Sequence, residues 1–153
     1  MKYAIALLLS LSPLLVQAVE VGEQLKPWTL LDQYDQAYSL NDQTRTLLVA
    51  SNMDGAKLVK AALEDRPKGY LEARNTVFVA DIQRMPALIS NLFAIPAMRD
   101  YSYRVLLDRD GSVATRYAPA EDKVLWLQLD KGQVVSQREF TSAEELRQAL
   151  EKQ

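Results

Sequence analysis

Apolar residues in this chain form either short continuous runs or stretches with helical spacing. The runs at 46–51 and 76–81 are apolar at most positions, which is typical of strands buried on both faces of a sheet. A third such run covers 103–108. Between the runs, apolar residues recur every three or four positions, as in an amphipathic helix. This pattern predicts alternating strands and helices, and therefore parallel strand pairing.

Two helices are predicted between these strands, each from apolar residues that share one face. In the segment after residue 51 these residues are Ala56, Val59, Ala62 and Leu63. In the segment after residue 84 they are Met85, Leu88, Ile89, Leu92 and Phe93. Such a stripe is expected to pack on the sheet, with Pro86 in the first turn. The following segment, 93–104, is interpreted as a loop.

Both ends of the chain predict antiparallel pairs. Segment 27–40 has two β-prone stretches around the turn formers of 32–36, which indicates a hairpin. Segments 124–130 and 133–140 predict a second hairpin across the dipeptide Lys131–Gly132.

Capping residues predict where the remaining helices begin. Ser112 is expected to cap a short helix that runs to about Tyr117. Residues 141–144, Thr-Ser-Ala-Glu, form a capping-box pattern that opens the last helix. The resulting order is hairpin, βα, βα, βα, ββ, α. It predicts one α/β domain over residues 19–153, a mixed sheet with helices on both faces.

Residues 1–18 are interpreted as a secretory signal peptide. Lys2 precedes the apolar stretch 4–16, and small residues lead to a cleavage site after Ala18. The apolar core is shorter than the ~20 residues of a bilayer span, and an uncleaved membrane anchor is the alternative. Cleavage would leave no stable membrane span. We therefore expect a secreted protein, located in the periplasm of a Gram-negative bacterium.

The composition excludes several kinds of chemistry. The 153 residues include no cysteine and no histidine, so thiol nucleophiles, disulfides, zinc sites built on Cys or His, and His-based triads are unavailable. The net charge is −2, and the sequence lacks the stripe of basic residues that is typical of a nucleic-acid-binding surface. No glycine-rich phosphate loop occurs. We assign no catalytic, cofactor-binding or metal-binding residue, and we expect no cofactor.

The layout resembles the thioredoxin-like superfamily, in particular its peroxiredoxin-like and periplasmic thioredoxin-like branch. The segment "LKPWTLLDQYDQAYSL" is similar to the opening hairpin of that branch, and "YRVLLDRDGSVATRYA" to its strand–Asp–turn–helix unit. The segments "VLWLQLDKGQVV" and "TSAEELRQALE" resemble its final hairpin and closing helix. The resemblance covers about 21–152 and implies a thioredoxin-like sheet with an N-terminal β-hairpin.

The chain departs from this superfamily at both catalytic landmarks. In such proteins a helix N-terminus lowers the pKa of a cysteine thiol. The two cysteines of a C-x-x-C motif would fall here at Met53 and Ala56. The cis-proline that faces them would fall near Val124, and without proline a cis bond costs ~3 kcal/mol, so a trans bond is expected. These departures argue against thiol redox catalysis.

Seven residues form a candidate binding surface, from the start of the first helix and from segment 93–104. They are Met53, Asp54, Lys57, Met98, Arg99, Tyr101 and Tyr103. Aromatic and arginine side chains are common at binding hot spots. The structural alternative is that segment 93–104 packs on the core, that Met53 covers the helix end, and that Asp54 is an N-cap or first-turn acid.

Asp81, Asp108 and Asp130 each end a predicted strand, which invites a metal site. The antiparallel direction of the last of these strands places Asp130 at the opposite end of the sheet, so the three cannot converge.

The leading hypothesis is a non-catalytic binding or accessory module whose partner is another periplasmic protein. The alternatives are an enzyme that uses Asp, Lys or Tyr at the vacated site, and a metal chaperone that uses Met53 and Met98.

Overall fold

The computed structural model describes residues 19–153. The predicted signal peptide and its cleavage site lie outside the described residues. The strands are β1 (Thr29–Asp32), β2 (Ala37–Ser39), β3 (Thr46–Ala50), β4 (Thr76–Asp81), β5 (Leu106–Asp108), β6 (Val124–Asp130) and β7 (Gln133–Phe140). The helical elements are α1 (Met53–Ala62), η1 (Glu72–Arg74), α2 (Ala87–Ile89), η2 (Ser90–Ala94), α3 (Ile95–Met98), α4 (Ala114–Tyr117) and α5 (Ala143–Glu151). None of the helices in this range is long and apolar enough to cross a membrane.

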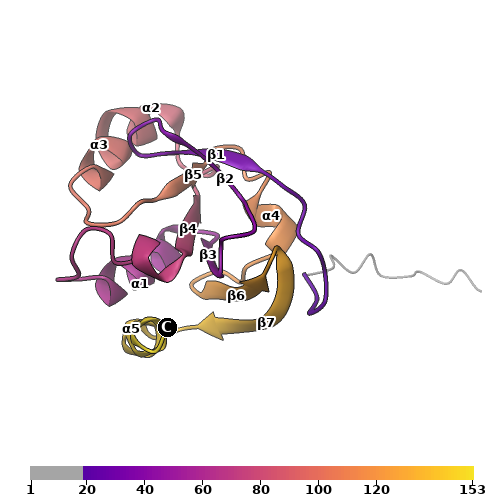
Figure 1. Ribbon diagram of the computed structural model, residues 1–153. Coiled ribbons are helices and arrows are strands. Elements are labelled where there is room, and N and C mark those ends of the chain that lie inside the picture. Colours follow the sequence, from indigo (N-terminus) through magenta and orange to yellow (C-terminus); the bar gives the residue numbers. More distant parts are fainter. Residues whose placement is uncertain (1–18) are drawn as a thin grey trace, which may run out of the picture.

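The described strands form one mixed sheet in the order β2-β1-β5-β4-β3-β6-β7 (Figure 1). The central strands β3, β4 and β5 pair in parallel, while β1 and β6 join them antiparallel. All five residues of β3 are buried, as expected of a strand covered on both faces. Both predicted hairpins are confirmed, and the second turns at Lys131 and Gly132, which both have positive φ.

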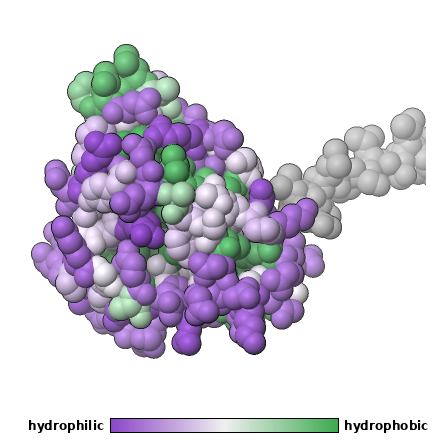
Figure 2. Space-filling view, turned by 45° about the horizontal axis from the view of Figure 1, so that its top comes forward, coloured by the Kyte–Doolittle hydropathy of each residue, from purple (hydrophilic) through white to green (hydrophobic). Residues whose placement is uncertain are grey.

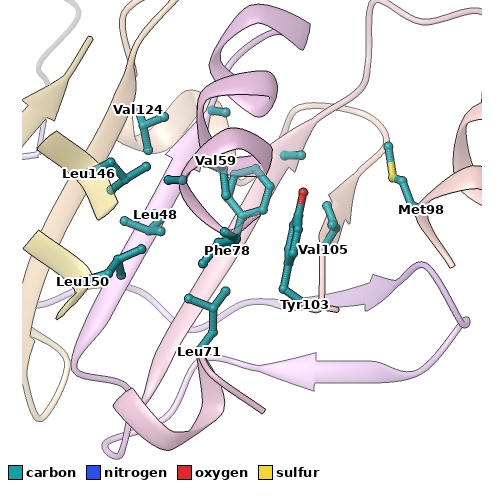
Figure 3. Packing of buried hydrophobic residues seen from close by; sticks show 14 of the residues in the cluster. Leu48, Val59, Leu71, Phe78, Met98, Tyr103, Val105, Val124, Leu146 and Leu150 are labelled. Carbon is teal, nitrogen blue, oxygen red and sulfur yellow. The ribbon is translucent and has the colours of Figure 1, made fainter. Parts of the chain in front are cut away.

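Helices cover both faces of the sheet, which confirms the predicted architecture. On one face, Val59 of α1 and Leu146 of α5 pack on Leu48 and Phe78 (Figure 3). On the other face, α4 and the N-terminal segment pack on a second cluster. There the Trp28 indole N–H donates a hydrogen bond of 2.6 Å to the Tyr117 hydroxyl. Without a disulfide, these two apolar layers supply the main stabilisation.

Strand β5 is shorter than predicted because a buried side chain takes over part of its pairing. The fully buried Gln33 donates to the carbonyl of Tyr103 at 2.8 Å and accepts from the Val105 N–H at 2.9 Å. These backbone groups are therefore satisfied without a neighbouring strand. The strand consequently begins at Leu106 and not at residue 103.

The helix after β4 differs most from the prediction. It continues from α2 through a π-helical turn, η2, to Met98, so the expected loop at 93–104 is helical in its first part. The Ile95 N–H donates to the Ser90 carbonyl, five residues back, just before Pro96, which has no N–H to donate. This wider turn changes which side chains face the sheet. Ser90, Ile95 and Met98 are buried there.

The predicted apolar stripe therefore does not pack on the sheet. Met85 is only partly buried. The other four members are between 45 % and 68 % exposed, and they are Leu88, Ile89, Leu92 and Phe93.

Two helix starts are capped by residues other than those predicted. The Asp108 carboxylate accepts from the backbone N–H groups of Val113 and Ala114, at 3.0 and 2.7 Å, and so takes the role expected of Ser112. Helix α5 is capped by the Ser142 hydroxyl, which accepts from the Glu145 N–H, one residue later than the predicted box.

Candidate functional site

The candidate site lies where β3 meets α1. The Asn52 side chain caps α1 by accepting from the Gly55 N–H at 3.0 Å. Asp54 is an exposed acid in the first turn, where the helix dipole favours negative charge, and this confirms one of its two expected structural roles. Met53, the first residue of α1, is 45 % exposed.

One side of this junction is closed by the loop before β6. The Asn52 amide donates to the Asp122 carboxylate at 2.9 Å. A Cβ atom on Gly55 would lie 2.6 Å from the carbonyl oxygen of Lys123, so the two backbones are in direct contact. No cis peptide bond occurs in residues 19–153, which confirms the trans bond expected before Val124.

The other side is open and forms a groove of about 330 Å³. It is lined by residues 51–54 of the β3–α1 junction, by Asp81 at the end of β4, and by Ile82, Arg84 and Met85, which follow that strand. Its floor is largely apolar, with charged side chains at the rim. Asp81 accepts two hydrogen bonds from Gln83, at 2.9 and 2.7 Å. Glu121 lies 2.8 Å from Arg84 and raises the pKa of that guanidinium.

A cluster of exposed apolar side chains begins three residues beyond the groove. This apolar patch consists of Leu88, Ile89, Leu92 and Phe93 on α2 and η2. Figure 2 shows it as a hydrophobic projection at the top of an otherwise mainly hydrophilic face. Contiguous exposed apolar surface of this kind marks interaction sites.

Comparison with solved structures identifies the architecture. Peroxidoxin BcpB from Mycobacterium tuberculosis superposes with a TM-score of 0.56 at 14 % identity, covering 86 % of this chain and 96 % of that one. The thioredoxin domain of a thiol-disulfide oxidoreductase from Bacteroides vulgatus gives 0.55 at 14 % identity, covering 88 % and 98 %. The fold is thioredoxin-like.

A peroxiredoxin-like protein from Aquifex aeolicus shares this fold at a TM-score of 0.57 and 8 % identity, covering 89 % of this chain and 88 % of that one. No family model and no curated protein matches the sequence. These likenesses establish the fold, while the chemistry named for those proteins belongs to them. This thioredoxin-like chain has no cysteine.

The structure separates the seven residues of the candidate binding surface. Met98 and Tyr103 are core side chains, so they do not belong to an exposed surface (Figure 3). Burial also raises the pKa of the Tyr103 hydroxyl. Met53 lines the groove and Met98 does not, so the structure does not bring these two thioethers to one surface site.

The remaining members lie near the groove or beside the core. Lys57 is exposed on α1, as Asp54 is. Tyr101 stacks on Tyr103 with ring centroids 5.1 Å apart. The Arg99 guanidinium donates to the Gln33 carbonyl at 2.8 Å. The structural alternative for segment 93–104 therefore holds only in part. Ile95, Met98 and Tyr103 pack in the core, whereas Phe93 and Arg99 are exposed. The exposed surface is instead the apolar patch. The sequence feature that could have revealed it is Pro96, because a proline without an N–H changes the helical hydrogen bonding of the segment that carries the apolar stripe.

The strand-end carboxylates are arranged as the topology predicted. Asp81 and Asp108 are partners in the β4–β5 register, whereas Asp130 ends the antiparallel β6 at the other end of the sheet. Asp108 is fully buried, and this burial raises the pKa of its carboxyl. In residues 19–153 no group of three or more Asp or Glu side chains is placed to hold a metal ion.

Proposed function

We propose that this protein is a periplasmic binding module that uses a thioredoxin-like fold without redox chemistry. Its partner would be another periplasmic polypeptide, bound through an apolar segment. The observation that carries this proposal is the apolar patch, four large side chains exposed on consecutive turns beside an open groove. The signal-peptide pattern of residues 1–18 supports the location.

The patch and the groove suit an extended apolar segment. Phe93 offers an aromatic anchor, and burial of such a ring is a large contribution to binding. The groove has room for one or two side chains against Met53 and Met85, while Asp54 and Arg84 provide a polar rim. An apolar centre with a charged rim is the common anatomy of a protein interface.

The enzyme alternative needs an activated group in the groove. Arg84 lines the groove as an exposed side chain, and its pairing with Glu121 raises the pKa of the guanidinium. This pairing does not favour acid–base catalysis at the groove.

Binding to a fluorescently labelled, permanently unfolded polypeptide tests the proposal. We expect saturable binding that weakens at least about tenfold in the variant Leu92→Ser/Phe93→Ser, because two apolar anchors are lost. Val135→Ser is the matched control, since Val135 is equally an exposed apolar residue but lies on β7. Equal binding by the double variant and the control would refute the assignment. Reduction of a disulfide substrate by the purified protein would refute the non-redox role.

A further inference from the structure

A second hollow, which we call the basic cleft, lies at the end of the sheet opposite to the groove. Its volume is about 460 Å³, and it is lined by the cations Arg45, Arg74, Arg138 and Lys152. Arg45 directly precedes β3 and Arg74 lies shortly before β4, whereas the groove follows the last residues of these strands. The basic cleft is therefore separate from the proposed polypeptide site.

The cleft concentrates positive charge. Within residues 19–153, no Asp or Glu side chain lines it, and none of its four cations has a carboxylate within 4.0 Å. The neighbouring Glu151 is instead engaged by Arg66 and Arg147. In a protein with a net charge of −2, this cluster is a local feature and not a consequence of composition.

Arg74 is fixed in the wall of the cleft. Its Nε donates to the Leu150 carbonyl at 2.9 Å and its Nη1 to the Tyr70 carbonyl at 3.1 Å. The guanidinium also lies 3.7 Å from the centroid of the Tyr70 ring. The bond to Leu150 offsets part of the negative end of the α5 dipole. The cations available to contact a ligand are therefore Arg45, Arg138 and Lys152.

The sheet supplies the rest of the site. Trp126 and Arg138 are partners in the β6–β7 register, and Gln128 and Ser136 are the next pair on the same face. The Arg138 guanidinium lies 4.6 Å from the centroid of the Phe140 ring, which restricts its motion. The floor therefore combines an indole, a hydroxyl and an amide beside the cations.

We propose that the basic cleft binds a small molecule that carries a diphosphate group. Guanidinium forks match phosphate oxygens in bidentate pairs, and the Ser136 hydroxyl in the lining adds a hydrogen-bond donor. A single phosphate brings at most two negative charges to the three cations that remain for a ligand, so two linked phosphates balance the site better. Because the cleft opens to solvent, added salt should weaken this binding.

Titration of the purified protein with inorganic diphosphate tests the proposal, with heat and Trp126 fluorescence as readouts. We expect one saturable site at low salt, with affinity reduced at least about tenfold in Arg138→Gln/Lys152→Gln. Both side chains are solvent-facing and the variant should fold, which its unfolding temperature checks. Lys26→Gln/Lys68→Gln removes the same charge from exposed positions outside the cleft and should bind as the original chain does.

The outcomes distinguish a specific diphosphate site from non-specific electrostatic attraction of diphosphate to the protein. Loss of affinity in the cleft variant alone supports the proposal. Equal losses in both variants would mean diffuse electrostatic attraction, and no saturable binding at low salt would mean no site; either result overturns it. Inorganic sulfate and vesicles with anionic phospholipids are further probes. Displacement of diphosphate by these vesicles, but not by sulfate, would assign the phosphate group to a lipid headgroup instead of a free molecule.

Discussion

At the scale of single residues, Gly55 controls how closely α1 approaches the loop before β6. A Cβ atom there would lie 2.6 Å from the Lys123 carbonyl oxygen and 3.1 Å from Cβ of Ala50. We expect Gly55→Ala to lower the free energy of unfolding by about 1–3 kcal/mol, because backbone must move to admit the methyl group. Urea unfolding measures this, with the exposed Lys57→Ala as control. An increase in stability would show that helix propensity outweighs the contact.

Asp108 and Asp110 are two acids on one turn with opposite pKa shifts. Burial raises the pKa of Asp108, although the N–H groups of Val113 and Ala114 partly oppose this. The Ser112 N–H lowers the pKa of the exposed Asp110. The stabilising effect of a raised acid pKa is present below the ordinary value of about 4 and is lost as the pH rises through the folded-state pKa.

This contrast predicts opposite responses to neutralisation. Asp108→Asn should make the protein more stable at pH 7, since the amide oxygen still accepts from the turn while no buried charge forms. Asp110→Asn should make it slightly less stable at pH 7. The difference for Asp108 should already be small below about pH 4, where this acid is protonated, whereas the difference for Asp110 should shrink only as the pH falls through its lowered pKa. Unfolding temperatures at pH 7 and at pH 3.5 test this, and a parallel loss in both variants would contradict it.

At the scale of elements, the start of α5 distinguishes two neighbouring hydroxyls. The Ser142 side chain accepts from the Glu145 N–H, whereas Thr141 lies outside the cap. We expect Ser142→Ala to cost about 1 kcal/mol in free energy of unfolding and Thr141→Ala to cost much less. Chemical denaturation of both variants decides between them. A larger cost for Thr141→Ala than for Ser142→Ala would instead place the N-cap at Thr141, as the sequence pattern predicted.

The elements also show which parts of a sequence can be interpreted locally. The runs at 46–51 and 76–81 and the hairpin at Lys131–Gly132 were predictable, because periodicity and turn chemistry act over a few residues. The late start of β5 at Leu106 was not predictable, because Gln33 bonds the backbone of the preceding residues from about 70 positions away. The exposed stripe at 88–93 depends on the turn that precedes Pro96, which amphipathicity alone does not reveal.

The candidate sites divide in the same way. Met53 and Asp54 were found from their place at a strand–helix junction. Met98 and Tyr103 were assigned wrongly to a surface, since aromatic and thioether side chains suit a core as well as an interface. The basic cleft joins cations that are up to about a hundred positions apart, so only the folded chain brings them together.

At the scale of the whole molecule, the two proposed sites lie at opposite ends of the sheet. The groove follows β3 and β4, and the basic cleft precedes them. Because the core between them is closely packed and the sites share no residue, we expect saturating diphosphate to change the dissociation constant for the unfolded polypeptide by less than about twofold. Binding measured with and without diphosphate tests this. A larger change would indicate coupling through the sheet.

The two outer strands of the sheet have a consequence for the protein at high concentration. Strand β2 has only three residues, and the beginning of β7 is covered by residues 22–25, where the Gly22 N–H donates to the Val134 carbonyl at 2.7 Å. Farther along β7, the exposed side chains include Arg138 and Glu139. Edge strands that are short, covered or charged offer a second molecule few backbone groups for strand pairing. We therefore expect this protein to resist fibrous aggregation at high concentration.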